Sequence, residues 1–160
     1  EEKRKYLLNL ASLDISHDQY LDAINLLEKN FGRINDPVLL EFFYPIPYSV
    51  ELRSFAAREN LNPLLIAAVL RTLNYYSKDV FQSGAKNSLY KLSAAIRKYQ
   101  NVYLGLTSYL TDGKYQLTNE IKEIANNDPD LFVEMLIDGV KFDLKEILNN
   151  YLIYKKIYSR

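Results

Sequence analysis

The chain has 160 residues, 48% of them hydrophobic and 25% charged, which is ordinary for one folded domain. Its 20 basic and 20 acidic residues cancel, so it lacks the positive excess that is typical of nucleic-acid-binding proteins. Without cysteine and with one histidine, it can form neither a disulfide nor a cysteine or multi-histidine metal site. We expect no metal and no cofactor.

The spacing of the hydrophobic residues is helical along nearly the whole chain, and no alternating pattern indicates a strand. This predicts an all-α fold. The longest nearly uninterrupted apolar run, Leu64 to Leu70, is far too short to span a membrane, and no signal peptide is visible. The first residue is Glu1 rather than methionine, which is consistent with a fragment whose targeting segment lay upstream.

The N-terminal part is expected to form helices over residues 3–13 and from Ser16 to about Phe31. Ser16 and Gln19 have the spacing of a capping box, and DQYLDAINLLEKN resembles half of a tetratricopeptide-type repeat. A short helix should follow from Asp36-Pro37, so residues 1–43 are expected to form a helical extension. One side of the first helix should be apolar, comprising Tyr6, Leu7, Leu10 and Leu13.

Two closely spaced prolines in YPIPYS, residues 44–49, interrupt the helical pattern. Ser49 is expected to cap a helix that ends at Glu59. Asn62-Pro63, a capping residue followed by proline at the first helical position, should start a buried helix to about Tyr75. Further helices are expected over 87–100, 101–111, 118–126, from Asp128-Pro129, and from a cap at Asp143 to Tyr158. The core side of the last helix should comprise Leu144, Ile147, Leu148, Tyr151, Leu152 and Tyr154.

Three segments of the chain resemble segments of one known family, and they occur in the same order as in that family. They are YPIPYSVELRSFAARENLNPLLIAAVLR (44–71), RKYQNVYLGLTSYLTDG (97–113) and the closing residues 128–160. They resemble the beginning, the middle and the end of the catalytic domain of soluble lytic transglycosylases. The resemblance implies a lysozyme-like, goose-type helical domain over residues 44–160 that follows the extension.

The family's Arg-Gln-Glu-Ser motif reads Arg71-Thr72-Leu73-Asn74 here, so Leu73 occupies the position of the catalytic glutamate. In the family that glutamate protonates the glycosidic oxygen and then takes a proton from the sugar's own 6-hydroxyl. Leucine can do neither, and such acid–base assistance is worth about 10²–10⁴-fold in rate. The glycine-rich segment is also reduced near Gly84, and the Tyr-Asn-Ala-Gly motif keeps only Tyr109. The resemblance therefore implies a pseudoenzyme.

The residues around the lost site are the candidates for a residual glycan or partner cleft, although the aromatic ones could equally build the core. A substitute acid would have to come from Glu51, Glu59 or Asp79. We expect Glu51 and Glu59 to be solvated charges on a helix surface and His17 to be a surface residue. The candidate cleft residues are Arg71, Asn74, Tyr75, Tyr76, Tyr90 and Tyr109.

Three functions follow from these observations. The first is a non-catalytic protein-interaction or scaffold module whose partner is another periplasmic or cell-envelope protein. The second is a module that binds peptidoglycan without cleaving it. The third, ranked last, is an active transglycosylase with a relocated acid. The periplasmic or cell-envelope location is implied by the resemblance alone.

Overall fold

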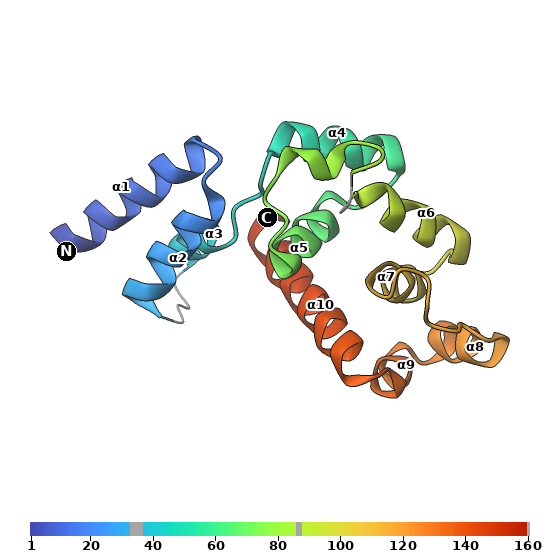
Figure 1. Cartoon of the computed structure of the whole chain (residues 1–160). Helices are drawn as coiled ribbons and strands as arrows, with labels where there is room; N and C mark the ends of the chain where they lie inside the picture. The colour runs from blue at the N-terminus through green and yellow to red at the C-terminus, as the bar shows by residue number, and fades with distance from the viewer. Residues whose placement is uncertain (33–36, 86–87, 160) are drawn as a thin grey trace.

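The computed structural model describes residues 1–32, 37–85 and 88–159, and every regular element in these ranges is a helix (Figure 1). The expected all-α class is confirmed. Within these ranges no helix combines the length and the apolar character needed to cross a membrane. The elements are α1 (Glu2–Ser16), α2 (Tyr20–Phe31), α3 (Pro37–Phe43), α4 (Ser49–Glu59), α5 (Pro63–Leu73), the short 3-10 helix η1 (Lys78–Phe81), α6 (Leu89–Tyr99), α7 (Val102–Leu110), α8 (Asn119–Asn127), α9 (Pro129–Met135) and α10 (Asp138–Tyr158).

Helices α1, α2 and α3 form a unit that we call the N-terminal hairpin, and they lie together at one end of the molecule (Figure 1). The hairpin has its own small apolar cluster. The predicted apolar side of α1 is only partly correct, because Tyr6 and Leu13 are 63% and 52% exposed while Leu7 and Ala11 are buried. Since α1 packs on few neighbours, only a narrow stripe of it is covered. The buried cluster comprises Ala11, Ala23, Leu27, Leu39 and Phe43.

The predicted capping box at the start of the second helix is wrong. Helix α1 continues through Ser16, whose hydroxyl donates a hydrogen bond to the Leu13 carbonyl at 2.7 Å. The chain then turns at Asp18, which has a φ of 61°, and α2 begins at Tyr20. The serine hydroxyl therefore satisfies a carbonyl of the helix that ends there, rather than an amide of the helix that follows.

Residues 44–159, which we call the body, share a second and larger core. Its centre is α5, in which every residue from Leu65 to Leu70 is buried, as the sequence predicts. The long α10 runs beside α5, while α6 to α9 curve round the other side (Figure 1). Ile15 and Tyr44 pack against both cores. The proposed division between residues 43 and 44 stays a prediction.

Helix α10 differs from its prediction at both its start and its core face. It begins at Asp138, and Asp143 lies inside it as a half-buried residue rather than at its cap. Leu152 is 59% exposed, because the residues that contact the rest of the body lie on the opposite face. Leu144, Ile147 and Tyr154 are fully buried, as predicted.

The predicted cap Asn62 is confirmed, since its side chain accepts a hydrogen bond from the Leu64 backbone N–H. Asn101, Thr118 and Asp128, where the sequence predicts helices to start, are likewise caps with a side-chain bond to the first turn. The predicted cap Ser49 is wrong: α4 does begin there, but Tyr48 precedes it in a left-handed conformation and caps without a side-chain bond. The predicted starts at Asp36 and Asn87 lie outside the described residues, and Ser88 caps α6.

Helices α6 and α7 approach each other closely at Gly105. A Cβ atom at this position would lie 2.5 Å from Ile96 Cγ1 and 2.8 Å from Ile96 Cα. Any larger residue would therefore force the two helices apart. The glycine is buried and lies in the middle of α7, where glycine lowers helix stability relative to alanine. The close contact with Ile96 explains why glycine is nevertheless present here.

Candidate functional site

Tyr20 is the centre of the junction between the hairpin and the body. Its hydroxyl accepts a hydrogen bond from the Tyr48 backbone N–H at 2.9 Å and donates one to Asp18 at 3.0 Å. Its ring meets Tyr48 edge-on, with centroids 5.0 Å apart, and stacks on Tyr76 at 6.0 Å. Burial raises the pKa of Tyr20 to about 12. The junction thus has an aromatic centre with satisfied polar groups.

The proline-interrupted segment between α3 and α4 is held by tyrosines from the end of α10. Tyr154 donates its hydroxyl to the Pro45 carbonyl at 2.9 Å, and Tyr158 donates to the Tyr44 carbonyl at 2.8 Å. These hydroxyls satisfy carbonyls that belong to no helix or sheet. Burial raises the pKa of Tyr158 to about 12. Part of the abundant tyrosine therefore has a structural role.

Arg71, in the last turn of α5, connects the body to both α2 and α3. Its guanidinium donates to the Phe43 carbonyl, pairs with Glu28 at 3.5 Å and lies 4.1 Å from the centroid of the Tyr44 ring. The Arg71 side chain is only 13% exposed. Because its mostly buried guanidinium contacts both α2 and the end of α3, Arg71 belongs to the junction and is also a candidate cleft residue.

A groove of about 1070 Å³ lies between the hairpin and the body. Helices α2 and α3 form one wall, α10 forms the other, and the end of α5 closes the groove between them. Of the six predicted cleft residues, Arg71, Asn74 and Tyr76 line it. Leu73 does not, and it packs half-buried against the core of the body. The groove therefore does not include Leu73.

The other three predicted cleft residues lie elsewhere. Tyr75 and Tyr109 are near each other. Burial is the main reason that the pKa of Tyr109 is raised, and the charge interaction with the Tyr75 phenol raises it further. Tyr90 packs edge-on against Phe55 with centroids 5.1 Å apart, and its hydroxyl accepts a hydrogen bond from Arg58. The six residues thus divide among three places in the structure.

Glu59 is a correction to the sequence analysis, because it is buried at 8% exposure rather than solvated. Ser93 donates to its carboxylate at 2.6 Å and Arg97 donates at 3.2 Å. The hydrogen bond from Ser93 is the main reason that the pKa of Glu59 is lowered, and the charge of Arg97 contributes to it. Residues of α6 cover this end of α4, which the sequence of α4 alone does not reveal.

The remaining titratable candidates lie on the surface. The Glu51 side chain is 40% exposed and pairs with Lys78 at 3.3 Å, so it is only partly the solvated charge that we expected. Asp79 and His17 are exposed. His17 stands at the end of α1 rather than in the first turn of the next helix.

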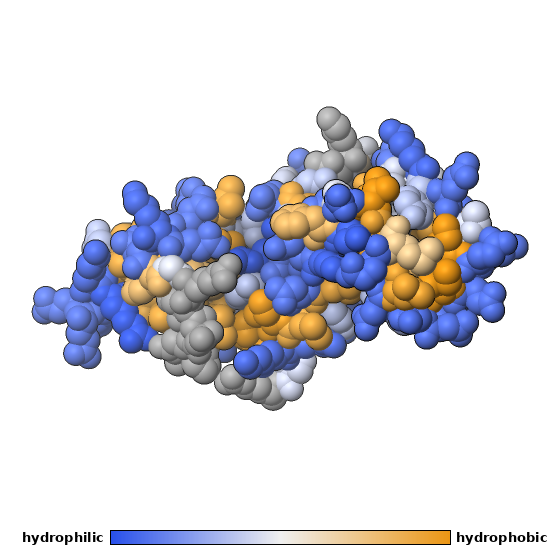
Figure 2. Space-filling model, turned by 90° about the horizontal axis from the view of Figure 1, so that it is seen from below, coloured by the Kyte–Doolittle hydropathy of each residue, from blue (hydrophilic) through white to orange (hydrophobic). Residues whose placement is uncertain are grey.

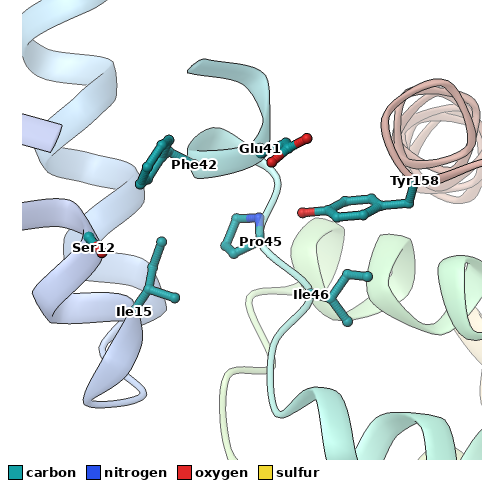
Figure 3. A pocket seen from close by; sticks show the side chains of 7 residues that line it. All are labelled: Ser12, Ile15, Glu41, Phe42, Pro45, Ile46 and Tyr158. Carbon is teal, nitrogen blue, oxygen red and sulfur yellow. The ribbon is translucent and has the colours of Figure 1, made fainter. Parts of the chain in front are cut away.

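A smaller pocket of about 270 Å³ lies on the other side of the junction, between α1, α3 and the YPIPYS segment (Figure 3). Ile15, Phe42 and Ile46 give it an apolar lining, and Glu41 and the Tyr158 hydroxyl stand at one side of it. Because the Tyr158 hydroxyl already donates to a backbone carbonyl, it contributes to the closure of this pocket more than to any chemistry.

One further surface feature is apolar. Seen from below, hydrophobic residues gather over the end of the molecule that α8 and α9 form (Figure 2). Four large apolar side chains of α9 and the start of α10 are exposed, and the Glu134 side chain among them pairs with Lys141 and Lys145. The exposed residues are Leu131, Met135, Ile137 and Phe142.

The sequence analysis missed one side of the groove altogether. Glu146, Asn149, Asn150 and Lys156 line it from α10, and Asn25 lines it from α2. Helical spacing along α10 is the signal that indicates them, since these residues share one face of the helix, while its other face contributes to the core.

Comparisons with protein-family models, with curated proteins and with solved structures find no match to this chain.

Proposed function

We propose that this chain is a lytic-transglycosylase-like domain that has lost catalysis and acts as a protein-interaction or scaffold module at the cell wall or in the periplasm. The observation that carries the proposal is Leu73, the last residue of the buried α5, at the position where the family has its acid. Its side chain packs against the core of the body. An apolar group so placed has no proton to exchange with a glycosidic oxygen.

The carboxylates that could replace the missing acid support the same conclusion. A general acid that works near neutral pH needs a raised pKa. The pKa of Glu59 is lowered instead, and its oxygens are bonded to Ser93 and Arg97. Glu51 is paired with Lys78, and Asp79 is exposed. The environment of Glu59, the buried member of the three, therefore favours the ionised carboxylate rather than a carboxyl group that keeps its proton.

The groove between hairpin and body supports a binding role. Its volume of about 1070 Å³ is in the range of known ligand sites, and its walls are fixed by the Tyr20 and Arg71 contacts. A site formed between two parts of a chain and held by satisfied polar contacts needs little rearrangement before a partner binds. The hairpin, which the family resemblance does not cover, supplies one of the two walls.

Digestion of purified peptidoglycan sacculi tests the loss of catalysis. We expect that the wild-type chain releases no 1,6-anhydro muropeptides, as measured by mass spectrometry, under conditions in which an active lytic transglycosylase releases them. Glu59→Gln and Glu51→Gln should be indistinguishable from the wild type. Release of anhydro products by the wild type would contradict the proposal, and its loss in one of these variants would identify the relocated acid.

Peptidoglycan binding without cleavage is a second candidate, because Tyr75 and Tyr109 lie near each other and both remain half-buried. Tyrosine rings suit the apolar faces of sugars. If this function holds, the chain sediments with sacculi, and Tyr75→Ala or Tyr109→Ala reduces the bound fraction. Tyr6→Ala, at a 63% exposed position on the hairpin, is the matched control that should not change it.

A further inference from the structure

The α10 wall of the groove is a mostly polar stripe. Glu146, Asn149, Asn150, Ile153 and Lys156 all line the groove, at spacings of three and four residues that place them on one face of the helix. From the first to the last of them the helix rises by about 15 Å, at about 1.5 Å per residue. Helix α10 can therefore contact a ligand over about 15 Å.

The opposite wall is largely apolar. Leu21 and Ile24 of α2 and Leu40 and Phe43 of α3 line it. Asn25 and Glu28 of α2 are the polar side chains on this wall, so the groove has one mostly apolar side and one mostly polar side. A ligand that fills it needs side chains of both kinds, or a backbone that faces the polar wall while apolar groups face the hairpin.

Carboxamides are the chemical feature that the groove's polar residues share. Asn25, Asn74 and Asn149 are exposed, and their side chains make no hydrogen bond to the described residues. Asn150 is 6% exposed and donates to Thr72 Oγ1 at 3.0 Å, which leaves its carboxamide oxygen available to the groove. A carboxamide offers one acceptor and two donors, which match the N–H and C=O groups of a peptide backbone.

The aromatic rings of the groove favour a peptide over a sugar chain. Sugar recognition uses open ring faces, but one face of Tyr44 is covered by the Arg71 guanidinium, 4.1 Å from its centroid. Tyr76 stacks on Tyr20, with centroids 6.0 Å apart. Both rings are thus engaged within the protein. Among the described residues, the groove's polar side chains without a hydrogen bond or ion pair include the carboxamides of Asn25, Asn74 and Asn149 and the charges at its two ends.

Those charges give the groove a direction. Glu146 and Lys156 are exposed and have no ion pair among the described residues. They stand at opposite ends of the α10 stripe. An extended peptide rises about 3.3 Å per residue, so about four or five residues span the roughly 15 Å between them. A cation near Glu146 and a carboxylate near Lys156 would complete the pairing.

We propose that this groove binds an extended segment of a partner protein, with a basic side chain at the Glu146 end and an acidic one about four or five positions away at the Lys156 end. The carboxamides hold its backbone, and its apolar side chains face Ile24 and Phe43. This inference rests on the proposed function as a protein-interaction module and assigns that function to the groove.

Selection from a phage-displayed library of random heptapeptides tests the proposal, followed by affinity measurement with synthetic fluorescent peptides. The groove variant is Asn74→Gly with Asn149→Ala. Glycine keeps the left-handed conformation of Asn74, which has a φ of 53°. The matched control is Asn60→Gly with Asn9→Ala, which makes the same changes at a left-handed helix end and an exposed helix position outside the groove.

We expect the selected peptides to carry a basic and an acidic residue about four or five positions apart, with apolar residues between them. The groove variant should weaken binding about 25-fold, at about fivefold for each lost hydrogen-bonding side chain, and the control should not. Glu146→Lys should lower the affinity for the selected peptides. A peptide whose basic residue is changed to glutamate should regain affinity for that variant.

The inference is overturned if no peptide is selected, or if the selected peptides bind the groove variant as well as the wild type. It is also overturned if an N-acetylglucosamine tetramer binds and loses affinity only in the groove variant, since the groove is then a glycan site. These results are separable from the proposed function. Peptides that bind elsewhere leave the interaction module intact, whereas cleavage of sacculi by the wild type contradicts it whatever binds in the groove.

Discussion

The hairpin and the body stabilise their helices in different ways. The body surrounds α5 on all sides and buries six consecutive residues from Leu65 to Leu70. The hairpin covers only narrow stripes of its helices around a small cluster that includes Ala11 and Leu27, and it leaves Tyr6 and Leu13 exposed. It is joined to the body by hydrogen bonds, ion pairs and stacked tyrosines as much as by apolar contact.

This difference indicates that the two regions are not equally able to stand alone. Small units bury too little apolar surface to offset the conformational entropy that folding costs. The hairpin therefore depends on its contacts with the body, whereas the body has a core of its own. We expect local unfolding of the hairpin at a lower free energy than global unfolding. The following changes test that expectation, from the largest effect to the smallest.

Leu70→Ala and Leu27→Ala remove fully buried side chains from the two cores. Each should cost about 3 kcal/mol, from lost burial and the cavity left behind. Leu70→Ala should lower the free energy of global unfolding, measured by urea denaturation. Leu27→Ala should instead increase hydrogen exchange of the hairpin amides and leave those of α5 protected. Equal effects of both changes on every amide would mean that hairpin and body form one cooperative unit.

Gly105→Ala should cost about 2 kcal/mol of global stability, because the added Cβ meets Ile96 at 2.5 Å and α6 and α7 must separate. Thermal unfolding followed by circular dichroism measures the loss. Gly139→Ala is the control, since a Cβ in that first turn of α10 meets no atom within 4 Å. If both variants unfold at the same temperature, the close crossing of α6 and α7 is not what holds that side of the body.

Alkaline pH should release the hairpin before the body unfolds. Tyr20, at the junction, has its pKa raised from 10.0 to about 12 by burial, so the fold favours its neutral form. Its contribution to stability is complete below about pH 10 and is lost as the pH rises towards about 12. Hairpin hydrogen exchange and tyrosinate absorbance should change together across this range. Tyrosinate formation that leaves hairpin protection unchanged would contradict this role of Tyr20.

Lys78→Met should have the smallest effect. Lys78 pairs with Asp18 of the hairpin at 3.6 Å and with Glu51 of the body at 3.3 Å, but its side chain is 53% exposed. Exposed pairs contribute little to stability, and salt screens them. Urea denaturation should therefore barely distinguish the variant from Lys114→Met, a change at an exposed lysine outside the junction. A clear loss of stability in Lys78→Met alone would make the ion pairs a main support of the hairpin.

Local signals made much of the fold predictable. The helical class follows from hydrophobic spacing, and the cap Asn62 and the helix start at Asp128 are predictable because a capping side chain acts within its own turn. The errors at Ser16 and Asp143 have the same origin. A serine can bond a carbonyl behind it as readily as an amide ahead of it, and an aspartate can lie inside a helix when the apolar pattern begins earlier.

The candidate site was less predictable, because its residues come together only through packing. Arg71, Asn74 and Tyr76 were chosen for their place beside Leu73, yet they line a groove that Leu73 does not reach. Asn149, some 75 positions away along the chain, faces them because α10 lies beside α5. The burial of Glu59 likewise depends on α6, which covers it from a distant part of the sequence. Such contacts leave no local pattern to read.

The division of the groove's walls between hairpin and body has a thermodynamic consequence. A ligand that touches both α2 and α10 binds only when the hairpin is packed against the body. Binding therefore stabilises the packed hairpin by the same free energy by which the packed hairpin stabilises the bound ligand. At a ligand concentration about 100 times Kd, that shift is about 2.7 kcal/mol. The N-terminal helices would then report occupancy: their amides become slow to exchange when the groove is filled, and their removal abolishes binding although every groove residue of α10 is still present.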